Sequence, residues 1–404
     1  MLRSLVGSEM CIRDRSGTLA YDPNYLNQTS GDYVNLKSGA VDWPVPTTNI
    51  SGSSGDARNI DDLWHAAVNG RGQYYSASNS KQLGEAISGV VNAITQQTGS
   101  ASAASTSALE LIAGDNNQVF QASYTTKTWI GDLKAFTLNG DTAEIGATPL
   151  WSAQTQLTQN TAASERKIYY KQPTSATRRE FNWTNLNADG LGANFSGLCA
   201  KSQRATQCDN LSAAEKTVAE TGSNLVGYLR GTRTYETASS ANSTTRALYR
   251  ARTGVLGDII NGAPVYVSKP PFSYTDAGYA AFVTAKRSRK PMVYVAANDG
   301  MLHAFSAASA DGGTEMWAYI PNAVMPEMYR LADSGYEARH RYFVDGAPVV
   351  ADIQVGTEWK TILVGGLNKG GRSYYALDVT DPANPLPLWE LSLIHISEPT
   401  RLLS

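Results

Sequence analysis

The segment VYVAANDGMLHAF, residues 293–305, decides the fold of this 404-residue chain. An apolar run leads into Asn298-Asp-Gly300, and a second apolar run follows at once. Asn, Asp and Gly supply the positive φ angles that a tight hairpin needs. In the second run, Leu302 and Ala304 alternate with His303, which is the period of two that places side chains on opposite faces of a strand. The segment predicts an antiparallel β-hairpin.

The hairpin belongs to a longer unit that occurs more than once. Gly262-Ala-Pro-Val265 recurs as Gly346-Ala-Pro-Val349, and each is followed by an extended run, a second strand, a tight turn, a third strand and a Trp on a fourth strand. The second strands are expected at Met292–Ala297 and Lys360–Gly365, the third at Leu302–Ser306 and Ser373–Val379 after the turns Asn298-Asp-Gly300 and Asn368-Lys-Gly-Gly371, and the tryptophans are Trp317 and Trp389.

An earlier copy of the unit precedes these two. Gly131-Asp-Leu-Lys-Ala-Phe136 matches Gly300-Met-Leu-His-Ala-Phe305 at four of six positions, and Trp151 follows it. Repeated four-stranded antiparallel units bury their apolar faces against one another, as in β-propellers. We therefore predict a mostly β chain in which residues 109–390 form an incomplete β-propeller of four-stranded blades.

A non-repeating insert, roughly 160–250, separates the first copy from the second. It contains LSAAEKTVAETGSNLVGYLRG at residues 211–231, where Ser212 is a suitable N-cap and the apolar spacing is helical. We expect a helical insert packed on the rim of the propeller.

Cys199 and Cys208 lie in a loop-like part of this insert. Two cysteines without a nearby His cannot complete a zinc site. We predict a local disulfide, which would place the protein in an oxidising compartment; two free buried thiols are the alternative.

Residues 16–98 have a different pattern. The spacing predicts a helix over Asp61–Asn69, a strand over Gln73–Ala77 and an amphipathic helix that begins at the N-cap Asn79. Helix, strand and helix together indicate the C-terminal part of an α/β domain. The Ala/Ser-rich segment 99–108 reads as a linker.

The residue patterns of the two ends differ from that of the rest of the chain. Residues 1–15 and 391–404 lack periodicity and look like adapter DNA translated in frame, so we expect them to be non-native and leave them, with Cys11, out of the fold reasoning. Disordered tails are the alternative. On this interpretation the natural protein was cut at both ends.

Composition narrows the class of protein. The net charge is −2, which argues against a nucleic-acid binder, and no apolar run is long enough to span a membrane. Only 17% of residues are charged, while Tyr (21) far exceeds Phe (8). This balance favours a secreted or surface β protein.

Few residues suggest catalysis. None of the histidines, His65, His303, His340 and His395, belongs to an HExxH, GxSxG or P-loop motif. We expect His65 to be a packing or surface residue, His303 to lie on a strand face rather than to act as a base, and His340 to be solvated before a strand.

Three aspartates near the repeats have structural interpretations. We expect Asp258 to be buried and to accept backbone N–H bonds, and Asp299 and Asp345, each before a glycine, to be turn residues. No enzyme activity is predicted.

Several long segments in order resemble the PilY/PilC family of type IV pilus proteins. They are residues 60–78, 249–267, 293–305 and 370–391, the last reading GGRSYYALDVTDPANPLPLWEL. The resemblance implies a von Willebrand factor A-like domain, whose C-terminal part is 16–98, followed by a β-propeller. It also implies an exported bacterial protein at the cell surface, pilus or outer membrane, with pilins, minor pilins and host-cell or abiotic surfaces as partners. The expected role is pilus assembly and tip-associated adhesion, supporting pilus extension, twitching motility and attachment.

The family's metal sites can be sought by motif. The D-x-S-x-S of the A-domain site is absent from 16–98. The best match to the family's calcium loop is Asn185, Asn187 and Asp189, but its twelfth position is Ser196 rather than Glu, and an ordinary Asn/Gly turn is the alternative. We expect no cofactor in this chain and calcium in the full-length family.

Two other functions remain open. A quinoprotein-like oxidoreductase would share the propeller, but the adjacent Cys–Cys pair of that class is missing. A glycan-binding propeller with no pilus role is the other alternative. Because open blade edges leave backbone groups unpaired, we expect the isolated 404-residue chain to aggregate or to remain partly unfolded rather than to melt sharply as a monomer.

Overall fold

The computed structural model describes residues 18–20, 29–46, 57–69, 98–99, 105–106, 117–240 and 244–392. The chain divides into two units, Met1–Gln96 and Gln97–Ser404. Each unit is described separately below.

The described part of the first unit is helical. It contains α1 (Asp32–Ser38) and α2 (Arg58–Asn69), so the helix predicted over 61–69 is present and begins three residues earlier. Trp64 is buried, with the Trp43 ring 5.2 Å from it between centroids. The predicted strand at 73–77 and the helix after Asn79 lie outside the described residues.

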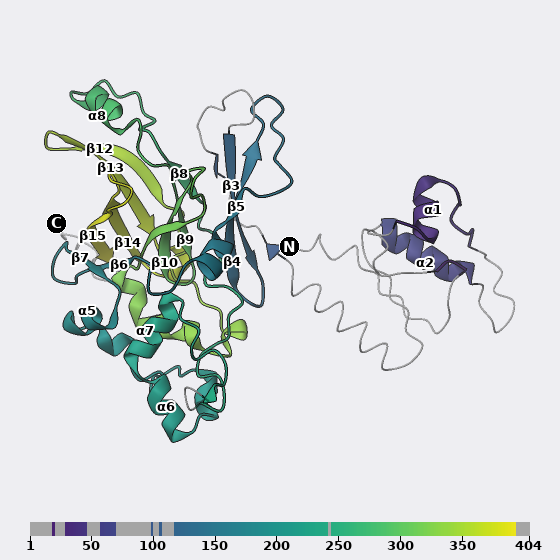
Figure 1. The fold of residues 1–404 in the computed structure, drawn as a ribbon, viewed down its shortest axis with the longest axis horizontal. Helices are drawn as coiled ribbons and strands as arrows, with labels where there is room; N and C mark the ends of the chain where they lie inside the picture. The colour runs from purple at the N-terminus through teal and green to yellow at the C-terminus, as the bar shows by residue number, and fades with distance from the viewer. Residues whose placement is uncertain are drawn as a thin grey trace, which may run out of the picture. The chain divides into compact units, whose positions relative to one another are not determined.

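Three β-sheets form the frame of the second unit (Figure 1). The first contains β1 (Thr98–Gly99), β2 (Ser105–Thr106), β3 (Asn117–Thr125), β4 (Ile130–Leu138) and β5 (Trp151–Ser152). The second contains β6 (Ile168–Lys171), β7 (Arg178–Glu180), β8 (Val265–Val267), β9 (Met292–Ala297), β10 (Met301–Ser306) and β11 (Glu315–Tyr319). The third contains β12 (Val349–Val355), β13 (Glu358–Gly366), β14 (Ser373–Asp378) and β15 (Leu386–Ser392).

The three copies share one strand register. In the second sheet Ala304 pairs with Tyr294 on one side and Trp317 on the other. The equivalent rows are Phe120, Ala135 and Trp151 in the first sheet and Val364, Ala376 and Trp389 in the third. The repeat found in the sequence is therefore a structural repeat, and the strand predicted at 292–297 is β9.

The second sheet has more strands than predicted. Its order is β7-β6-β11-β10-β9-β8, so the unit is six-stranded rather than four-stranded. The extra strands come from the insert, in which Ile168 and Tyr170 are buried with the alternation of a strand. β6 pairs in parallel with β11, Ala318 opposite Ile168. The expectation of a wholly helical insert was wrong in this part.

Short helices lead into the insert and make up much of the rest of it. They are α4 (Ala153–Thr155), the π-helix η2 (Gln156–Asn160), α5 (Trp183–Ala188), η3 (Gly192–Asn194), η4 (Thr206–Asp209), α6 (Ala213–Ala219) and α7 (Gly222–Arg230). Ser212 caps α6 as predicted, because its hydroxyl accepts the Glu215 N–H and the Glu215 carboxylate accepts the Ser212 N–H. The later helices are α8 (Tyr279–Lys286), η6 (Asn322–Ala332), η7 (Tyr336–Ala338) and η8 (Asn368–Gly370).

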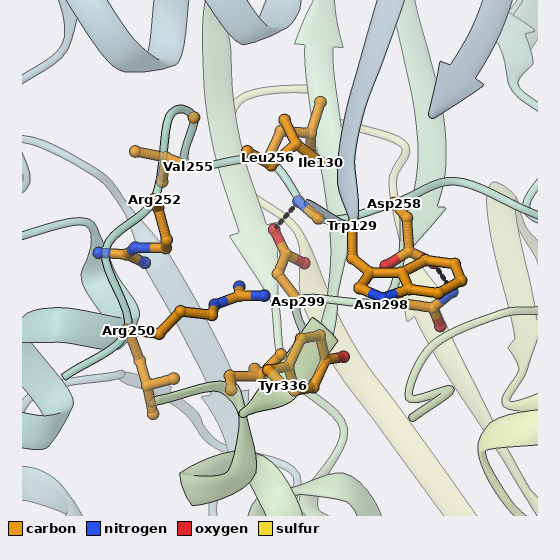
Figure 2. A pocket seen from close by; sticks show the side chains of 14 residues that line it. Trp129, Ile130, Arg250, Arg252, Val255, Leu256, Asp258, Asn298, Asp299 and Tyr336 are labelled. Carbon is orange, nitrogen blue, oxygen red and sulfur yellow. Dashed lines mark hydrogen bonds between the residues drawn. The ribbon is translucent and has the colours of Figure 1, made fainter. Parts of the chain in front are cut away.

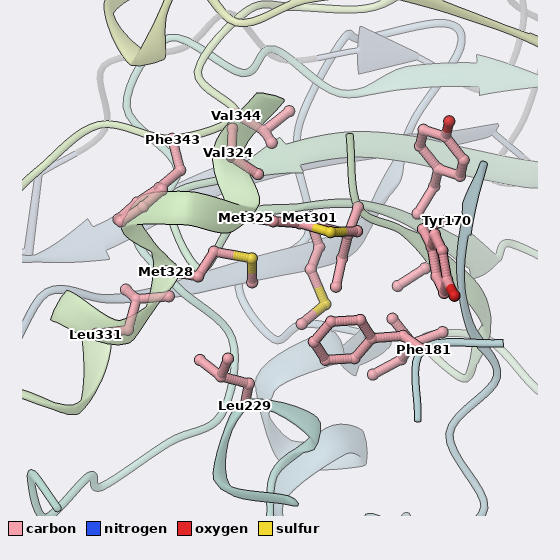
Figure 3. Packing of buried hydrophobic residues seen from close by; sticks show 14 of the residues in the cluster. Tyr170, Phe181, Leu229, Met301, Val324, Met325, Met328, Leu331, Phe343 and Val344 are labelled. Atoms are coloured by element: carbon pink, nitrogen blue, oxygen red, sulfur yellow. The ribbon is translucent and has the colours of Figure 1, made fainter. Parts of the chain in front are cut away.

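Two apolar clusters hold the sheets together. One joins the first sheet to the second through Phe120, Leu133, Val293 and Phe305. The larger one joins the second sheet to the third and to the helical insert. Figure 3 shows part of it, where Met301, Met325 and Met328 lie between Phe181 and Phe343. The second sheet thus covers an apolar face of the first, and the third covers an apolar face of the second, which removes these facing surfaces from water.

Candidate functional site

Side chains from all three copies meet beside the repeated Gly-Ala-Pro segments. The Asp258 carboxylate is buried and lies 2.8 Å from Asn298 Nδ2 and 2.9 Å from His340 Nε2. The His340 ring stacks on Trp129, with centroids 3.8 Å apart. Asp258 is thus buried as predicted, but its carboxylate contacts side chains rather than backbone N–H groups.

His340 is a clear correction. Its side chain is only 9% exposed, whereas the sequence predicted a solvated residue between Arg339 and Arg341. The reason is that Trp129, at the hairpin between β3 and β4, covers its ring. No local pattern near His340 could reveal this partner.

The aspartates before glycines also do more than shape turns. Asp345 is fully buried and its carboxylate accepts from Asn261 Nδ2 at 2.7 Å. These residues occupy equivalent positions before the two Gly-Ala-Pro segments, so the repeats are joined by their own matching residues. The Asp299 carboxylate accepts the N–H groups of Gly257 at 3.0 Å and Met301 at 3.2 Å.

A second buried cluster links the insert to the second sheet. Arg166 donates through Nε and Nη2 to the two oxygens of Glu315, at 2.7 and 2.8 Å. His303 lies between Glu315 (Nδ1, 2.7 Å) and Asp299 (Nε2, 3.1 Å). The side chains of Arg166, Glu315 and His303 are at most 1% exposed. This paired geometry is what a buried charge needs in order to be tolerated.

Arg166 and Glu315 were missed from the sequence. Arg166 lies in the insert, far along the chain from Glu315. The local signal is Glu315 itself, an acid at the start of the apolar strand EMWAY, which neighbours the strand of His303 in the same sheet. His303 was correctly placed on a strand face and makes ion pairs there.

The cluster predicts a pH dependence of stability. Burial lowers the pKa of His303, but the carboxylates of Asp299 and Glu315 outweigh it and raise this pKa to about 9, above the ordinary 6.5. Because this pKa is raised in the folded state, protonated His303 contributes its full stabilisation below pH 6.5. This contribution is lost as the pH rises through 9. Thermal melts from pH 6 to pH 10 should therefore show the melting temperature of the natural protein converging on that of His303→Gln. A difference between the two proteins that does not change with pH would contradict this role.

The stability that Glu315 contributes in the same cluster is lost as the pH falls. Burial raises the pKa of Glu315, but Arg166 and His303 lower it to about 2, below its usual 4.5. Its contribution is present above pH 4.5 and is lost as the pH falls toward 2. The cluster therefore stabilises the fold most between about pH 4.5 and 6.5.

The pocket beside these clusters is small. Figure 2 shows Trp129, Arg250, Asp258, Asp299 and Tyr336 around it. Its cavity volume is about 20 Å³, which suits about one water molecule rather than a substrate. A second hollow of about 230 Å³ lies on the insert, beside the rings of Tyr228, Tyr235 and Tyr249. Neither places a histidine or carboxylate beside a Ser or Cys nucleophile in the way that covalent catalysis requires.

The weak calcium candidates lie on and after one short helix. Asn185 and Asn187 are on α5, and Asp189 is its C-cap. The Asp189 carboxylate accepts from Tyr170 Oη at 2.5 Å and from Arg179 Nε at 3.1 Å. In the described part of the chain, no group of three His, Cys, Asp or Glu side chains could hold a metal ion. The calcium loop stays a prediction for the longer family.

The cysteine pair forms a disulfide in the structure. The Cα atoms of Cys199 and Cys208 lie 5.5 Å apart, and Cys208 is buried. The neighbouring Gln207 donates to the carbonyls of Leu248 and Ala332, both at 2.9 Å. The disulfide therefore closes this loop of the insert, and Gln207 joins the loop to distant backbone. Across the described residues, no helix is long and apolar enough to cross a membrane.

The chain is similar to known pilus proteins. Residues 256–398 match the family model of the PilY1 β-propeller domain, so the match reaches into the segment 391–404 that was expected to be non-native. The type IV pilus biogenesis factor PilY1 of Pseudomonas aeruginosa PAO1 is 36% identical over 379 residues, covering 90% of this chain and 30% of that protein. A PilY1 homologue of Xylella fastidiosa is 34% identical over 279 residues, covering 67% of this chain and 19% of that protein.

One solved structure is also similar in sequence. The crystal structure of the Pseudomonas aeruginosa PilY1 C-terminal domain is 40% identical, over 32% of this chain and 25% of that one, with a TM-score of 0.26. The chain spans about 30% of the length of the first curated relatives it matches. These relatives and the match to the propeller model show that the chain belongs to the PilY1 family.

Proposed function

We propose that this protein is a type IV pilus assembly factor and tip-associated adhesin. The observation that carries the proposal is the 36% identity over 90% of the chain to a protein named as a type IV pilus biogenesis factor. The role would be to support pilus extension, twitching motility and attachment. The partners would be pilins, minor pilins and host-cell or abiotic surfaces, met at the bacterial surface, on the pilus or at the outer membrane.

The proposal assigns the work to surfaces rather than to catalysis. The buried acids and bases of the second unit are matched to one another: Arg166 with Glu315, His303 with two carboxylates, and Asp258 with His340. Side chains that are paired and shielded in this way stabilise a scaffold, while the loops between strands stay free to vary. The relatives' names likewise describe pilus biogenesis factors, not enzymes.

The proposed architecture is a partial β-propeller. The first strands of the three copies, β2, β8 and β12, lie near one another, with β8 next to both of the others. That is the arrangement of inner strands around a propeller axis. We propose that the three sheets are blades, the second widened by β6 and β7, that residues 16–98 are the end of a von Willebrand factor A-like domain, and that calcium binds elsewhere in the full-length protein.

Deletion of the gene in its natural host tests the proposed role. We expect twitching zones and attachment to fall to near the level of a strain without pilin, and a plasmid copy of the gene to restore both. Normal twitching with reduced attachment would instead favour the glycan-binding alternative. Normal values of both would refute a pilus role.

A further inference from the structure

The hollow of about 230 Å³ lies on the surface of the insert, beside α7. This helix lies among the short helices of the insert (Figure 1). Ser223, Asn224 and Tyr228 reach the hollow from α7, and Thr232 and Tyr235 reach it from the segment that follows. One short stretch of chain therefore forms most of its wall.

Three tyrosine rings form the apolar part of the hollow. Tyr228 and Tyr249 are buried, with ring centroids 5.1 Å apart. Their hydroxyls donate to backbone carbonyls, that of Tyr228 to Arg250 at 3.1 Å and that of Tyr249 to Ala219 at 3.0 Å. The half-buried Tyr235 ring stands at 90° to the Tyr249 ring, with centroids 6.0 Å apart. The rings thus provide a floor and a wall, and hydrogen bonds already hold the floor in place.

Neutral polar groups form the rim of the hollow. Ser223 and Thr232 are exposed, and Asn224 is half-buried. The Asn224 Nδ2 group donates to the carbonyl of Val218 at 2.9 Å, which holds the side chain and leaves its Oδ1 to accept. Within the described residues, the hydroxyls of Ser223, Thr232 and Tyr235 make no hydrogen bond. They can therefore donate to a ligand or accept from it without breaking a bond of the fold.

The described side chains that line the hollow carry no charge. The Arg252 guanidinium lies 3.7 Å from the centroid of the Tyr228 ring, but it is not part of the lining. Glu236 pairs with it at 2.6 Å, and both side chains are at most 7% exposed. A charged ligand would therefore lose its hydration without gaining a partner of opposite charge. The lining favours a neutral ligand that has an apolar face and several hydroxyls.

We infer that this hollow binds one neutral sugar ring, the terminal unit of a surface glycan. A pyranose ring presents a patch of C–H groups next to a rim of hydroxyls, which matches tyrosine rings bordered by hydroxyl and amide groups. The volume of about 230 Å³ is below the about 300–1,000 Å³ of sites for drug-sized ligands, so it suits a single ring. The inference rests on the adhesive part of the proposed function and gives that part a ligand class and a site.

Saturation-transfer NMR on the purified protein tests the inference. The probes are the methyl glycosides of glucose, galactose, mannose and N-acetylglucosamine, and the charged comparisons are glucuronic acid and N-acetylneuraminic acid. We expect saturation transfer to at least one of the four neutral glycosides and none to the two acids, because the lining offers no charged partner.

Two variants locate the bound sugar. Ser223→Trp fills the hollow from an exposed position of α7 and should abolish the transfer. Tyr235→Phe keeps the ring and removes only a hydroxyl that the fold does not use, so it should weaken binding by about threefold without changing the melting temperature. The matched control is Tyr274→Phe. Tyr274 is 40% exposed and stacks on Trp359 outside the hollow, so this variant should bind the sugar as the natural protein does.

Three results would overturn the inference. The first is no transfer to any of the four neutral glycosides. The second is transfer that Ser223→Trp leaves unchanged, because the sugar would then bind elsewhere; if Ser223→Trp does not fold, unchanged affinity in Tyr235→Phe decides the matter. The third is binding of p-cresol in place of the sugars, which would assign the hollow to an aromatic side chain of a protein partner. Twitching does not enter these readouts, so failure of the inference is distinguishable from failure of the proposed pilus role.

Discussion

Replacing Arg166 with methionine should lower the free energy of unfolding by about 3–5 kcal/mol, the usual cost of leaving one member of a buried ion pair without its partner. The Glu315 carboxylate would then lie in the interior with only His303 near it, because Arg166 supplies both of the bonds that face the insert. Arg166 also donates to the carbonyl of Arg230 at 2.9 Å, so the end of α7 would lose an anchor as well. Urea unfolding of the purified protein measures the effect.

The matched control is the same change at an exposed ion pair. Arg204 pairs with Asp209 on the insert, and both side chains are more than half exposed. Exposed pairs contribute about 0–1 kcal/mol, so Arg204→Met should be close to neutral. Equal losses in the two variants would show that burial of the Arg166 cluster does not matter, and would refute this account of how the insert is held.

Replacing Gly346 with alanine should cost about 3 kcal/mol or more, because overpacking against rigid backbone cannot be relieved by a side-chain rotation. A Cβ atom at Gly346 would overlap the carbonyl oxygen of Gly366 on β13. The equivalent Gly262 meets the carbonyl of Ala296 on β9 in the same way. The Gly-Ala-Pro segment is thus repeated because the chain passes directly over the neighbouring strand, and Gly262→Ala should have a similar effect.

Gly227 on α7 is the control for glycine replacement. Its nearest neighbour would be the Thr232 side chain at 3.6 Å, an ordinary contact. Alanine is favoured over glycine in helices by about 1 kcal/mol, so Gly227→Ala should be neutral or stabilising. Chemical denaturation of the three variants would contradict the close-approach explanation if Gly346→Ala were as stable as Gly227→Ala.

The repeats could be read from the sequence because their signals are local. Asn298-Asp-Gly300 specifies a tight turn between β9 and β10, and Gly300 has the positive φ of 94° that such turns use. The capping box at Ser212 is equally local. Apolar alternation then identifies the strands, and the spacing of Trp317 and Trp389 identifies the unit.

The rest depends on contacts between distant parts of the chain. β6 joins β11 across about 150 residues, and no tight turn in the sequence indicates this parallel pairing of a four-residue strand. Burial of His340 needs Trp129 from the first copy, and pairing of Glu315 needs Arg166 from the insert. The candidate site was therefore only partly visible: Asp258 was expected to be buried, but its side-chain partners were not.

Counting surface pili by electron microscopy tests the central claim most directly. Cells lacking the gene would receive the natural gene, Gly346→Ala or Gly227→Ala, with protein amounts checked by immunoblot. We expect pili to be lost in the deletion and with Gly346→Ala, and to be restored by the natural protein and Gly227→Ala. Normal numbers of pili on cells without the gene would contradict the account.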